Sequence, residues 1–143
     1  MLGKYIHDNL WDEKTGFLYD QYADGTLCKT KGIGAYWALF TNVLDTIQLN
    51  RMIKELDNPE TFNRKFRVPS LSADHPKYKE NGRYWQGGIW PGTNYMVIQG
   101  LVKKGYRKLA REIALNHYNE VLEVYKNTGT FWEYYSPEKA EPG

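Results

Sequence analysis

The sequence predicts an all-α fold built of antiparallel helix pairs, with one short β-hairpin near its N-terminal end. Apolar residues recur at helical spacing in five segments of the chain. Asp24 and Gly25 form a turn signal between two β-prone runs, and residues 60–92 hold the prolines and glycines of a long loop. Helix pairs separated by loops build bundles, solenoids or closed α/α toroids, and periodicity does not choose among these three.

The first three helical segments precede the long loop. A weak apolar stripe over residues 2–10 is followed by the hairpin, whose Asp-Gly pair predicts a type I′ turn. The second helix is expected over residues 33–44. Its apolar face would be formed by Ile33, Tyr36, Trp37, Phe40 and Leu44. Asp45 is the expected N-cap of the third helix, which ends before Pro59.

The last two helical segments predict an antiparallel hairpin. Thr93 can cap a fourth helix that extends to residue 104, where Gly105 is suited to end it. A fifth helix is expected over residues 107–127. Because an antiparallel pair returns the chain to its starting end, the loop before the fourth helix and the segment after the fifth should meet. The polar side of the fifth helix is expected to carry Glu112, Glu120 and Glu123.

Length and composition narrow the class of protein. A chain of 143 residues has room for one domain, and 41% hydrophobic with 25% charged residues exclude a disordered or membrane-spanning chain. The net charge of +2 and the scattered lysines and arginines argue against nucleic acid and anionic membranes as partners. The single cysteine, Cys28, allows no internal disulfide and slightly favours a reducing compartment such as the cytoplasm, without fixing the localisation.

No cofactor or metal site is expected. The three histidines, His7, His75 and His117, are far apart in the sequence and lack the spacing of metal ligands. The sequence also has neither a glycine-rich phosphate loop nor a serine nucleophile elbow, which argues against nucleotide binding and serine hydrolase chemistry.

Two segments concentrate the aromatic residues, which make up 15% of the chain. In residues 84–91, Trp85 and Trp90 flank a glycine pair before a helix, a geometry that can present indole faces and backbone N–H groups to a polar ligand. In residues 131–135, Glu133 stands among aromatics that would desolvate its carboxylate and make it a stronger base once ionised. The alternatives are that both tryptophans fill space between helices and that Glu133 is a surface residue.

Several motifs resemble, in their order along the chain, those of glycoside hydrolase family 63 and its trehalase-like and mannosylglycerate hydrolase-like relatives. They are Phe-Leu-Tyr-Asp at 17–20, Val-Pro-Ser-Leu at 68–71, Tyr-Trp-Gln-Gly-Gly-Ile-Trp-Pro at 84–91 and Trp-Glu-Tyr-Tyr at 132–135. The resemblance implies an (α/α)6 toroid that hydrolyses α-glycosidic bonds with inversion, by means of an aspartic acid and a glutamate. Residues 1–143 would then be a C-terminal fragment of a single catalytic domain, forming part of the toroid.

The resemblance also assigns roles to individual residues. Glu133 corresponds to the general base, and Tyr135 to the tyrosine of the same Glu-x-Tyr motif, at the substrate site. Trp85 corresponds to the tryptophan that lines the sugar site, with Trp90 in a supporting role. These assignments place one of the two required carboxylates in this chain.

Tyr84 and Gln86 are the remaining candidate substrate contacts. Tyr84 would pack on the sugar ring beside Trp85, and Gln86 would hydrogen-bond the sugar hydroxyls, although the family usually has arginine at that position. The family's acid motif, of the form Gly-Trp-Asp, does not occur in this sequence. The acid and the rest of the toroid would therefore come from outside the chain, and the segment alone would expose apolar helix faces that favour self-association.

Two other classes of function stay open. A non-catalytic sugar-binding or helical interaction module would use the same surface. An α/α-toroid sugar isomerase or epimerase would use a histidine as acid and base, so a histidine beside Trp85 and Trp90 would favour it. For the hydrolase, the expected small-molecule partner is an oligosaccharide or glycoside.

Overall fold

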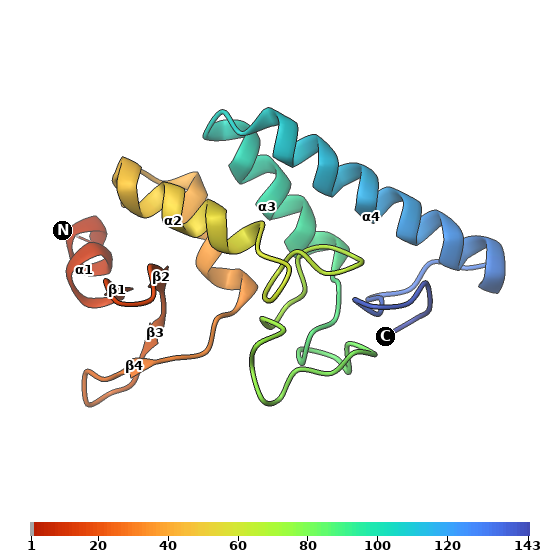
Figure 1. The fold of residues 1–143 in the computed structure, drawn as a ribbon, viewed down its shortest axis with the longest axis horizontal. Coiled ribbons are helices and arrows are strands. Elements are labelled where there is room, and N and C mark those ends of the chain that lie inside the picture. The colour runs from red at the N-terminus through yellow and green to blue at the C-terminus, as the bar shows by residue number, and fades with distance from the viewer. Residues whose placement is uncertain (1) are drawn as a thin grey trace.

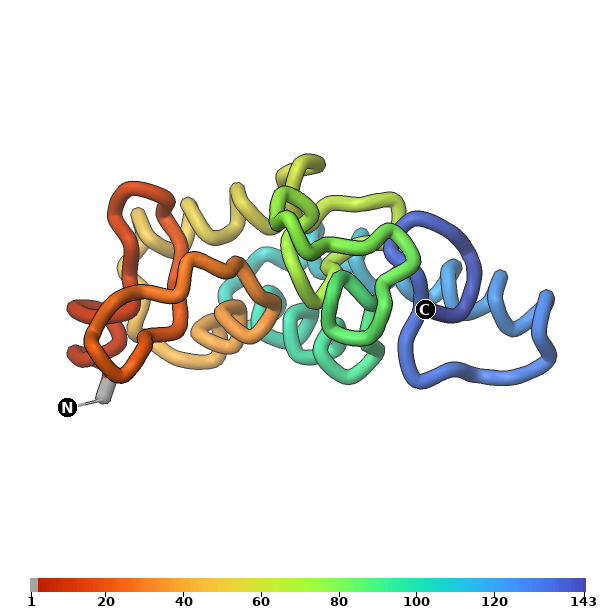
Figure 2. The backbone as a smooth tube through the Cα atoms, turned by 90° about the horizontal axis from the view of Figure 1, so that it is seen from below, coloured from red at the N-terminus to blue at the C-terminus, as the bar shows by residue number. Residues whose placement is uncertain are grey.

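The computed structural model describes residues 2–143, and for Leu2 the backbone alone (Figure 1). Its elements are, in chain order, α1 (Leu2–Asn9), β1 (Trp11–Asp12), β2 (Phe17–Leu18), β3 (Asp20–Gln21), β4 (Leu27–Cys28), the 3₁₀ helix η1 (Ile33–Phe40), α2 (Thr46–Leu56), α3 (Pro91–Lys103) and α4 (Arg107–Thr128). Figure 2 shows an elongated chain, with the strands near one end and the segment after α4 near the other. Within the described residues, no helix combines the length and apolarity needed to cross a membrane.

Among the helices, α3 packs extensively on both α4 and η1, and α2 is joined to η1 by the hydrogen bond from Tyr36 to Met52. As the sequence predicts, α3 and α4 run antiparallel and pack along each other (Figure 1). Gly105 ends α3 with a φ of 86°, and the next N–H, of Tyr106, donates to Leu101 O at 2.9 Å. The contact between α3 and η1 is close. A Cβ on Gly100 would lie 2.7 Å from Leu39 Cβ, so this close approach requires glycine.

The N-terminal hairpin is confirmed, but its turn is not the predicted type I′. β3 pairs with β4 in the register Asp20↔Cys28. A type I′ turn needs a positive φ at both central residues; Gly25 has a φ of 88°, whereas Asp24 does not have a positive φ. Gly25 N–H donates to Tyr22 O at 2.9 Å, which gives a three-residue loop ending in a left-handed glycine. A second ladder, β1 with β2, has no counterpart in the predicted elements.

The predicted α-helix over residues 33–44 is wrong in type and in length, because the chain forms the 3₁₀ helix η1 and leaves it after Phe40. With three residues per turn, Ile33, Tyr36 and Leu39 share one face, and all three are buried. Trp37, which α-helical spacing places on the apolar face, is 51% exposed.

The starts of α2 and α3 differ in how they are capped. Asp45 caps α2 as predicted: its carboxylate accepts the N–H of Gln48 at 2.8 Å, and Gln48 Oε1 accepts the N–H of Asp45 at 3.1 Å. The prediction that Thr93 caps the fourth helix is wrong, because α3 begins earlier, with Pro91 at its first position and Trp90 as N-cap. The Thr93 hydroxyl instead donates to Trp90 O at 3.0 Å.

The apolar interior has a large and a small cluster. The large one joins the N-terminal strands to η1, α2, α3 and α4 and is formed by Phe17, Tyr19, Ile33, Tyr36, Leu39, Met52, Leu56, Phe62, Val68, Val97, Leu101, Ala110 and Ile113. The small one comprises Phe66, Ile89, Val124 and Tyr135. Because it joins the long loop, α4 and the C-terminal tail, the small cluster positions the two segments that the sequence singles out.

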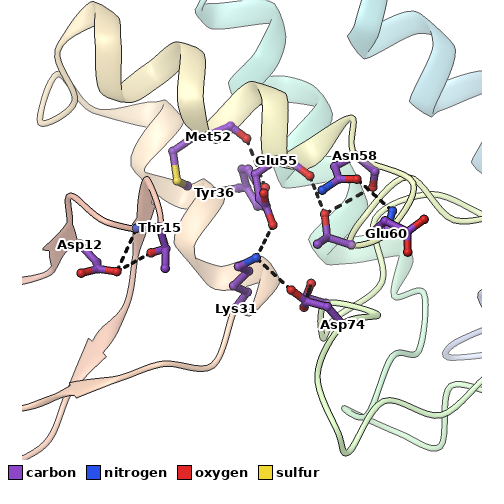
Figure 3. A network of polar contacts seen from close by, with 11 residues as sticks. Asp12, Thr15, Lys31, Tyr36, Met52, Glu55, Asn58, Glu60 and Asp74 are labelled. Carbon is purple, nitrogen blue, oxygen red and sulfur yellow. Dashed lines mark hydrogen bonds and ion pairs between the residues drawn. The ribbon is translucent and has the colours of Figure 1, made fainter.

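A polar network ties η1, α2 and the long loop together (Figure 3). Lys31 Nζ lies 2.6 Å from Glu55 Oε1 on α2 and 3.0 Å from Asp74 Oδ2 in the loop. Burial alone would lower the pKa of Lys31, but the hydrogen bonds to both carboxylates outweigh it and raise the pKa above its usual value. Tyr36 OH donates to Met52 O at 3.3 Å and joins η1 to α2 directly.

Candidate functional site

The loop before α3 and the segment after α4 meet in a short antiparallel β-bridge. Ile89 N–H donates to Tyr135 O at 2.9 Å, and Tyr135 N–H donates to Ile89 O at 3.0 Å. Their side chains are buried together with Phe66 and Val124. The prediction that the tryptophan motif and the glutamate motif meet at one end of the helix pair is therefore confirmed, and Figure 1 shows that end.

Four aromatic side chains from the two segments form an aromatic cluster, namely Tyr84, Trp85, Trp90 and Tyr134. Trp85 stacks on Trp90 with ring centroids 4.2 Å apart and planes at 8°, and Trp90 stacks on Tyr134 at 4.8 Å and 18°. Tyr84 lies edge-on to the other three. Trp90 is buried, whereas Trp85 and Tyr84 are 47% and 56% exposed. The cluster thus fills space with one tryptophan and presents the other to solvent.

The backbone of the tryptophan motif is unusual at Tyr84 and Gly88. Tyr84 has a φ of 59°, in the left-handed region that residues other than glycine rarely adopt. A Cβ on Gly88 would lie 2.5 Å from Tyr84 O and 2.9 Å from Tyr134 Cδ2, so glycine lets the loop fold against both segments. Trp90 Nε1 and Gly88 N–H both donate to Tyr84 O, at 3.3 and 3.2 Å. The surrounding contacts thus hold a conformation that is costly in isolation.

Glu133 is exposed in the tail, beside Tyr134. The expectation that aromatic neighbours desolvate its carboxylate is wrong for this chain, because those neighbours pack elsewhere. Phe131 stacks on Tyr125 at 4.8 Å, and Tyr134 turns to Trp90. In the described part of the chain, the carboxylate of Glu133 has no hydrogen-bond or ion-pair partner. Its oxygens are therefore free to meet a water or a ligand.

Tyr135 and Gln86, two predicted substrate contacts, are placed in different surroundings. Tyr135 is 1% exposed, and its hydroxyl accepts the N–H of Trp132 at 3.1 Å, so the side chain supports the tail from inside. Gln86 is partly buried, and its backbone O accepts the N–H of Lys79 at 2.8 Å. Its side-chain amide makes no hydrogen bond within residues 2–143, which leaves it available to a ligand.

A polar pair on α4 joins the buried Glu120 to the mostly buried His117. Glu120, expected on the polar side of the fifth helix, is 0% exposed. Its Oε2 lies 3.2 Å from His117 Nδ1, and its Oε1 has no partner among the described residues. Burial raises the pKa of Glu120 to about 9 and lowers the pKa of His117 to about 4. The signal that indicates this pair is spacing, because both residues fall on the helix face that Ile113 and Val124 bury.

No histidine packs on the tryptophans among the residues that the structure describes. The rings in contact with Trp85 and Trp90 all belong to the aromatic cluster itself. His117 instead meets Tyr135 edge-on, with centroids 6.2 Å apart. The observation that would favour an isomerase or epimerase is thus not found in residues 2–143.

Two apolar grooves of about 500 Å³ each lie beside helices of the chain. One runs between α3 and α4 and is lined by residues that include Tyr95, Tyr118 and Trp132. The other lies between α1, the hairpin strands and η1, and Trp37 is part of its wall. Neither groove is lined by Glu133 or by the aromatic cluster. They are therefore apolar faces that flank the candidate site.

Comparisons with known proteins point to one family. The sequence profile of the mannosylglycerate hydrolase MGH1-like glycoside hydrolase domain matches residues 2–143. A mannosylglycerate hydrolase from Thermus thermophilus is 28% identical over 131 residues, which make up 90% of this chain and 29% of that protein. The chain thus spans less than a third of the length of this relative.

Solved structures of helical glycosidases share the fold. The GH63 mannosylglycerate hydrolase from Thermus thermophilus in complex with glucose aligns with a TM-score of 0.78 at 23% identity, over 94% of this chain and 32% of that chain. A neutral trehalase from Saccharomyces cerevisiae aligns with a TM-score of 0.81 at 15% identity, over 96% of this chain and 25% of that chain. At these identities the likeness concerns the fold alone.

Proposed function

The chain belongs to the mannosylglycerate hydrolase MGH1-like glycoside hydrolase family, and from this premise we propose that it supplies the general base of an inverting glycoside hydrolase. The substrate class is an oligosaccharide or glycoside with an α-linked sugar such as glucose or mannose. The observation that carries the proposal is the Ile89–Tyr135 bridge, which holds the exposed Glu133 beside the aromatic cluster. The chain would form the C-terminal part of a single catalytic domain, completed as an (α/α)6 toroid by the rest of a longer protein.

The surroundings of Glu133 support the role of base. In an inverting glycosidase an ionised carboxylate takes a proton from the attacking water, while a carboxylic acid protonates the leaving oxygen. Glu133 is exposed and unpaired in the described chain, on a tail anchored by two backbone hydrogen bonds. The acid would be an aspartate outside this chain, with the two carboxyl groups about 6.5–9.5 Å apart to leave room for the water. Neighbouring helix pairs would shield Glu133 from bulk solvent.

The aromatic cluster supports the binding of a sugar ring. Trp85 has one face against Trp90, and its 47% exposure leaves the other face for the apolar side of a pyranose. Tyr84 would extend that surface. The unpaired amide of Gln86 can both donate to and accept from sugar hydroxyls. We assign Tyr135 a supporting role at the substrate site, because its buried hydroxyl fixes the backbone just before Glu133.

The test uses a protein of the relatives' length that contains this chain. Hydrolysis of α-linked glucosides and mannosides, mannosylglycerate among them, is followed by NMR of the anomer formed first, which inversion makes β. Glu133→Gln should lower kcat by about 10²–10⁴-fold with a small change in KM, because it removes the base and keeps the side-chain volume. Glu123→Gln, which changes an exposed glutamate of α4, is the matched control and should keep full activity.

Azide provides an independent test with Glu133→Ala. Azide attacks without needing a base, so it should restore bond cleavage and give a glycosyl azide of inverted configuration. Full activity in Glu133→Gln would show that another residue is the base, and the α anomer as first product would overturn the inverting mechanism. The 143-residue chain alone should be inactive, and clear turnover by it would overturn an acid located elsewhere.

A further inference from the structure

The buried pair on α4 touches the tail that carries Glu133. The ring of His117 packs edge-on against Tyr135, at 82° and 6.2 Å between centroids. Glu120 lies behind it, fully buried, with Oε2 3.2 Å from His117 Nδ1. Glu120 and His117 therefore form a polar pair on α4, and the His117 ring of this pair packs on Tyr135 of the tail.

Tyr135 connects His117 to Trp132, the residue before Glu133. Its hydroxyl accepts the N–H of Trp132 at 3.1 Å, and its backbone forms both hydrogen bonds of the bridge to Ile89. Trp132 Nε1 also donates to Thr128 Oγ1, in the last turn of α4, at 3.0 Å. The backbone on either side of Glu133 is thus set by α4 through Tyr135 and Thr128.

We propose that Glu120 and His117 are positioning residues, which hold Tyr135 and thereby residues 132–135 in the geometry that Glu133 needs. This inference rests on the proposed function of Glu133, and neither residue is expected to touch the substrate. Stability does not account for the pair, because a buried carboxyl with an unpartnered Oε1 costs free energy that an apolar side chain would avoid. This free-energy cost is located at Glu120, whose partner His117 makes the contact with Tyr135 of the tail.

The pair holds one proton near neutral pH, since burial raises the pKa of Glu120 to about 9 and lowers that of His117 to about 4. The charged groups on the neighbouring loop and tail are engaged elsewhere. They are Lys65 over the Phe66 ring, Arg67, whose Nη2 pairs with Asp57 while its Nε has no partner among the described residues, and Glu138 paired with Arg64. Loss of this proton would create an uncompensated buried charge on Glu120, beside the His117 ring that packs on Tyr135, and a test can use this perturbation.

The test follows the 143-residue chain by carbon-detected NMR, which does not depend on amide protons that exchange quickly in alkali. The side-chain carboxyl carbon of Glu120 reports its own ionisation, and the backbone carbonyls of residues 132–135 report the tail. In the wild-type chain both sets of signals should shift together, with one midpoint near pH 9. Glu120→Gln should keep the neutral-pH tail signals and lose the alkaline step, whereas Glu123→Gln should keep the step.

Each outcome decides the proposal. A common midpoint that Glu120→Gln abolishes supports it. A tail that does not respond when the Glu120 carboxyl titrates, or a step that persists in Glu120→Gln, overturns it. The readout is independent of catalysis: if Glu133→Gln leaves hydrolysis intact in the longer protein, the proposed function fails while the coupling between Glu120 and the tail still stands or falls by these spectra.

Discussion

The two halves of the molecule, residues 2–66 and 67–143, differ in how they satisfy buried polar groups. Among the described residues, the buried side-chain atoms without a hydrogen-bond partner all belong to the second half: Arg67 Nε, Asn94 Oδ1 and Glu120 Oε1. The two non-glycine residues with positive φ, Val68 and Tyr84, also lie there. The first half instead contributes Lys31 and Glu55 to a fully paired network, which also includes Asp74 of the second half (Figure 3). The unpartnered buried polar atoms and the strained backbone positions thus lie in the half that carries Glu133, as is typical of functional regions.

The same substitution should have opposite effects in the two halves, and this is the largest expected difference. Glu120→Gln removes a carboxyl whose pKa is about 9 in the folded chain and usually 4.5. Between these two pH values, folding must keep this carboxyl protonated, which costs ~1.4 kcal/mol of stability for each pH unit above 4.5. The variant should gain up to about 3 kcal/mol at pH 7. Glu55→Gln weakens the 2.6 Å contact with Lys31 and should lose about 1–3 kcal/mol. Chemical denaturation measures both, and a destabilised Glu120→Gln would break the comparison.

Glycine substitutions sharpen the comparison at the level of the backbone. Gly88→Ala places a Cβ 2.5 Å from Tyr84 O and should cost about 1–3 kcal/mol, because the two site segments must separate. Gly34→Ala in η1 meets nothing within 4 Å and should be neutral or gain up to about 1 kcal/mol. Thermal unfolding gives the stabilities, and the exciton signal of the stacked tryptophans in circular dichroism should weaken only in Gly88→Ala. Equal losses in both variants would contradict the contrast.

The two halves should also lose stability at opposite ends of the pH scale, the second half in alkali and the first half in acid. The folded His117–Glu120 pair holds one proton between about pH 4 and 9, whereas the unfolded pair holds one between 4.5 and 6.5 and none above. Stability from the pair is therefore level up to about pH 6.5 and falls by ~1.4 kcal/mol per unit as the pH rises toward 9. Glu120→Gln should abolish this alkaline loss in a series of thermal unfolding curves.

Asp12 gives the first half its acid sensitivity. Its hydrogen bond to Lys29, with further bonds from Thr15, lowers the pKa of Asp12 from 3.8 to about 2. A lowered carboxyl pKa contributes stability above the unfolded value, and that contribution is lost as the pH falls through about 2. Asp12→Asn should therefore flatten the acid limb of the stability profile and leave the alkaline limb unchanged, in the same unfolding series.

The smallest expected effect concerns the apolar grooves at the flanks. Tyr118, which is 61% exposed in the groove of α3 and α4, and Trp37, 51% exposed in the groove of η1, should promote weak self-association of the isolated chain. Charged replacements, Tyr118→Glu and Trp37→Glu, should each lower it. Sedimentation velocity over a range of concentrations measures the change, and a monomer at every concentration would remove the prediction.

Much of the helical framework could be predicted from local signals. Asp45 and Gln48 mark the start of α2, Gly105 marks the end of α3, and an antiparallel pair forces the segments beyond α3 and α4 to meet. The 3₁₀ geometry of η1 could not, because the apolar residues at 33, 36 and 37 form an α-helical face while those at 33, 36 and 39 form a 3₁₀ face, so the pattern fits both. Which of Trp37 and Leu39 is buried depends on the packing of α3 against η1, which the local pattern does not contain.

The candidate site could be predicted in composition but less well in arrangement. The tryptophan and glutamate motifs stand out by their aromatic residues, and their meeting follows from the helix hairpin. The exposure of Glu133 could not be predicted, because it depends on Phe131 stacking on Tyr125 and Tyr134 stacking on Trp90, which the local sequence does not specify. The expected place of Glu120 on the surface is wrong, because a glutamate normally indicates the surface and its burial depends on how the long loop and the tail pack against α4.

The bridge between Ile89 and Tyr135 also determines when the site can form during synthesis. The whole α3–α4 hairpin separates the two partners, so the ribosome, which adds about 5–20 residues per second, exposes the tryptophan motif seconds before the tail arrives. In that interval Ile89 lacks both backbone partners and Trp90 lacks the ring of Tyr134. Folding of the hairpin brings the two ends together and reduces the entropy cost of closing so long a loop. The contact that assembles the site thus forms only after α3 and α4 have been synthesised, and a nascent chain halted before residue 135 contains α1 to α4 but no closed site.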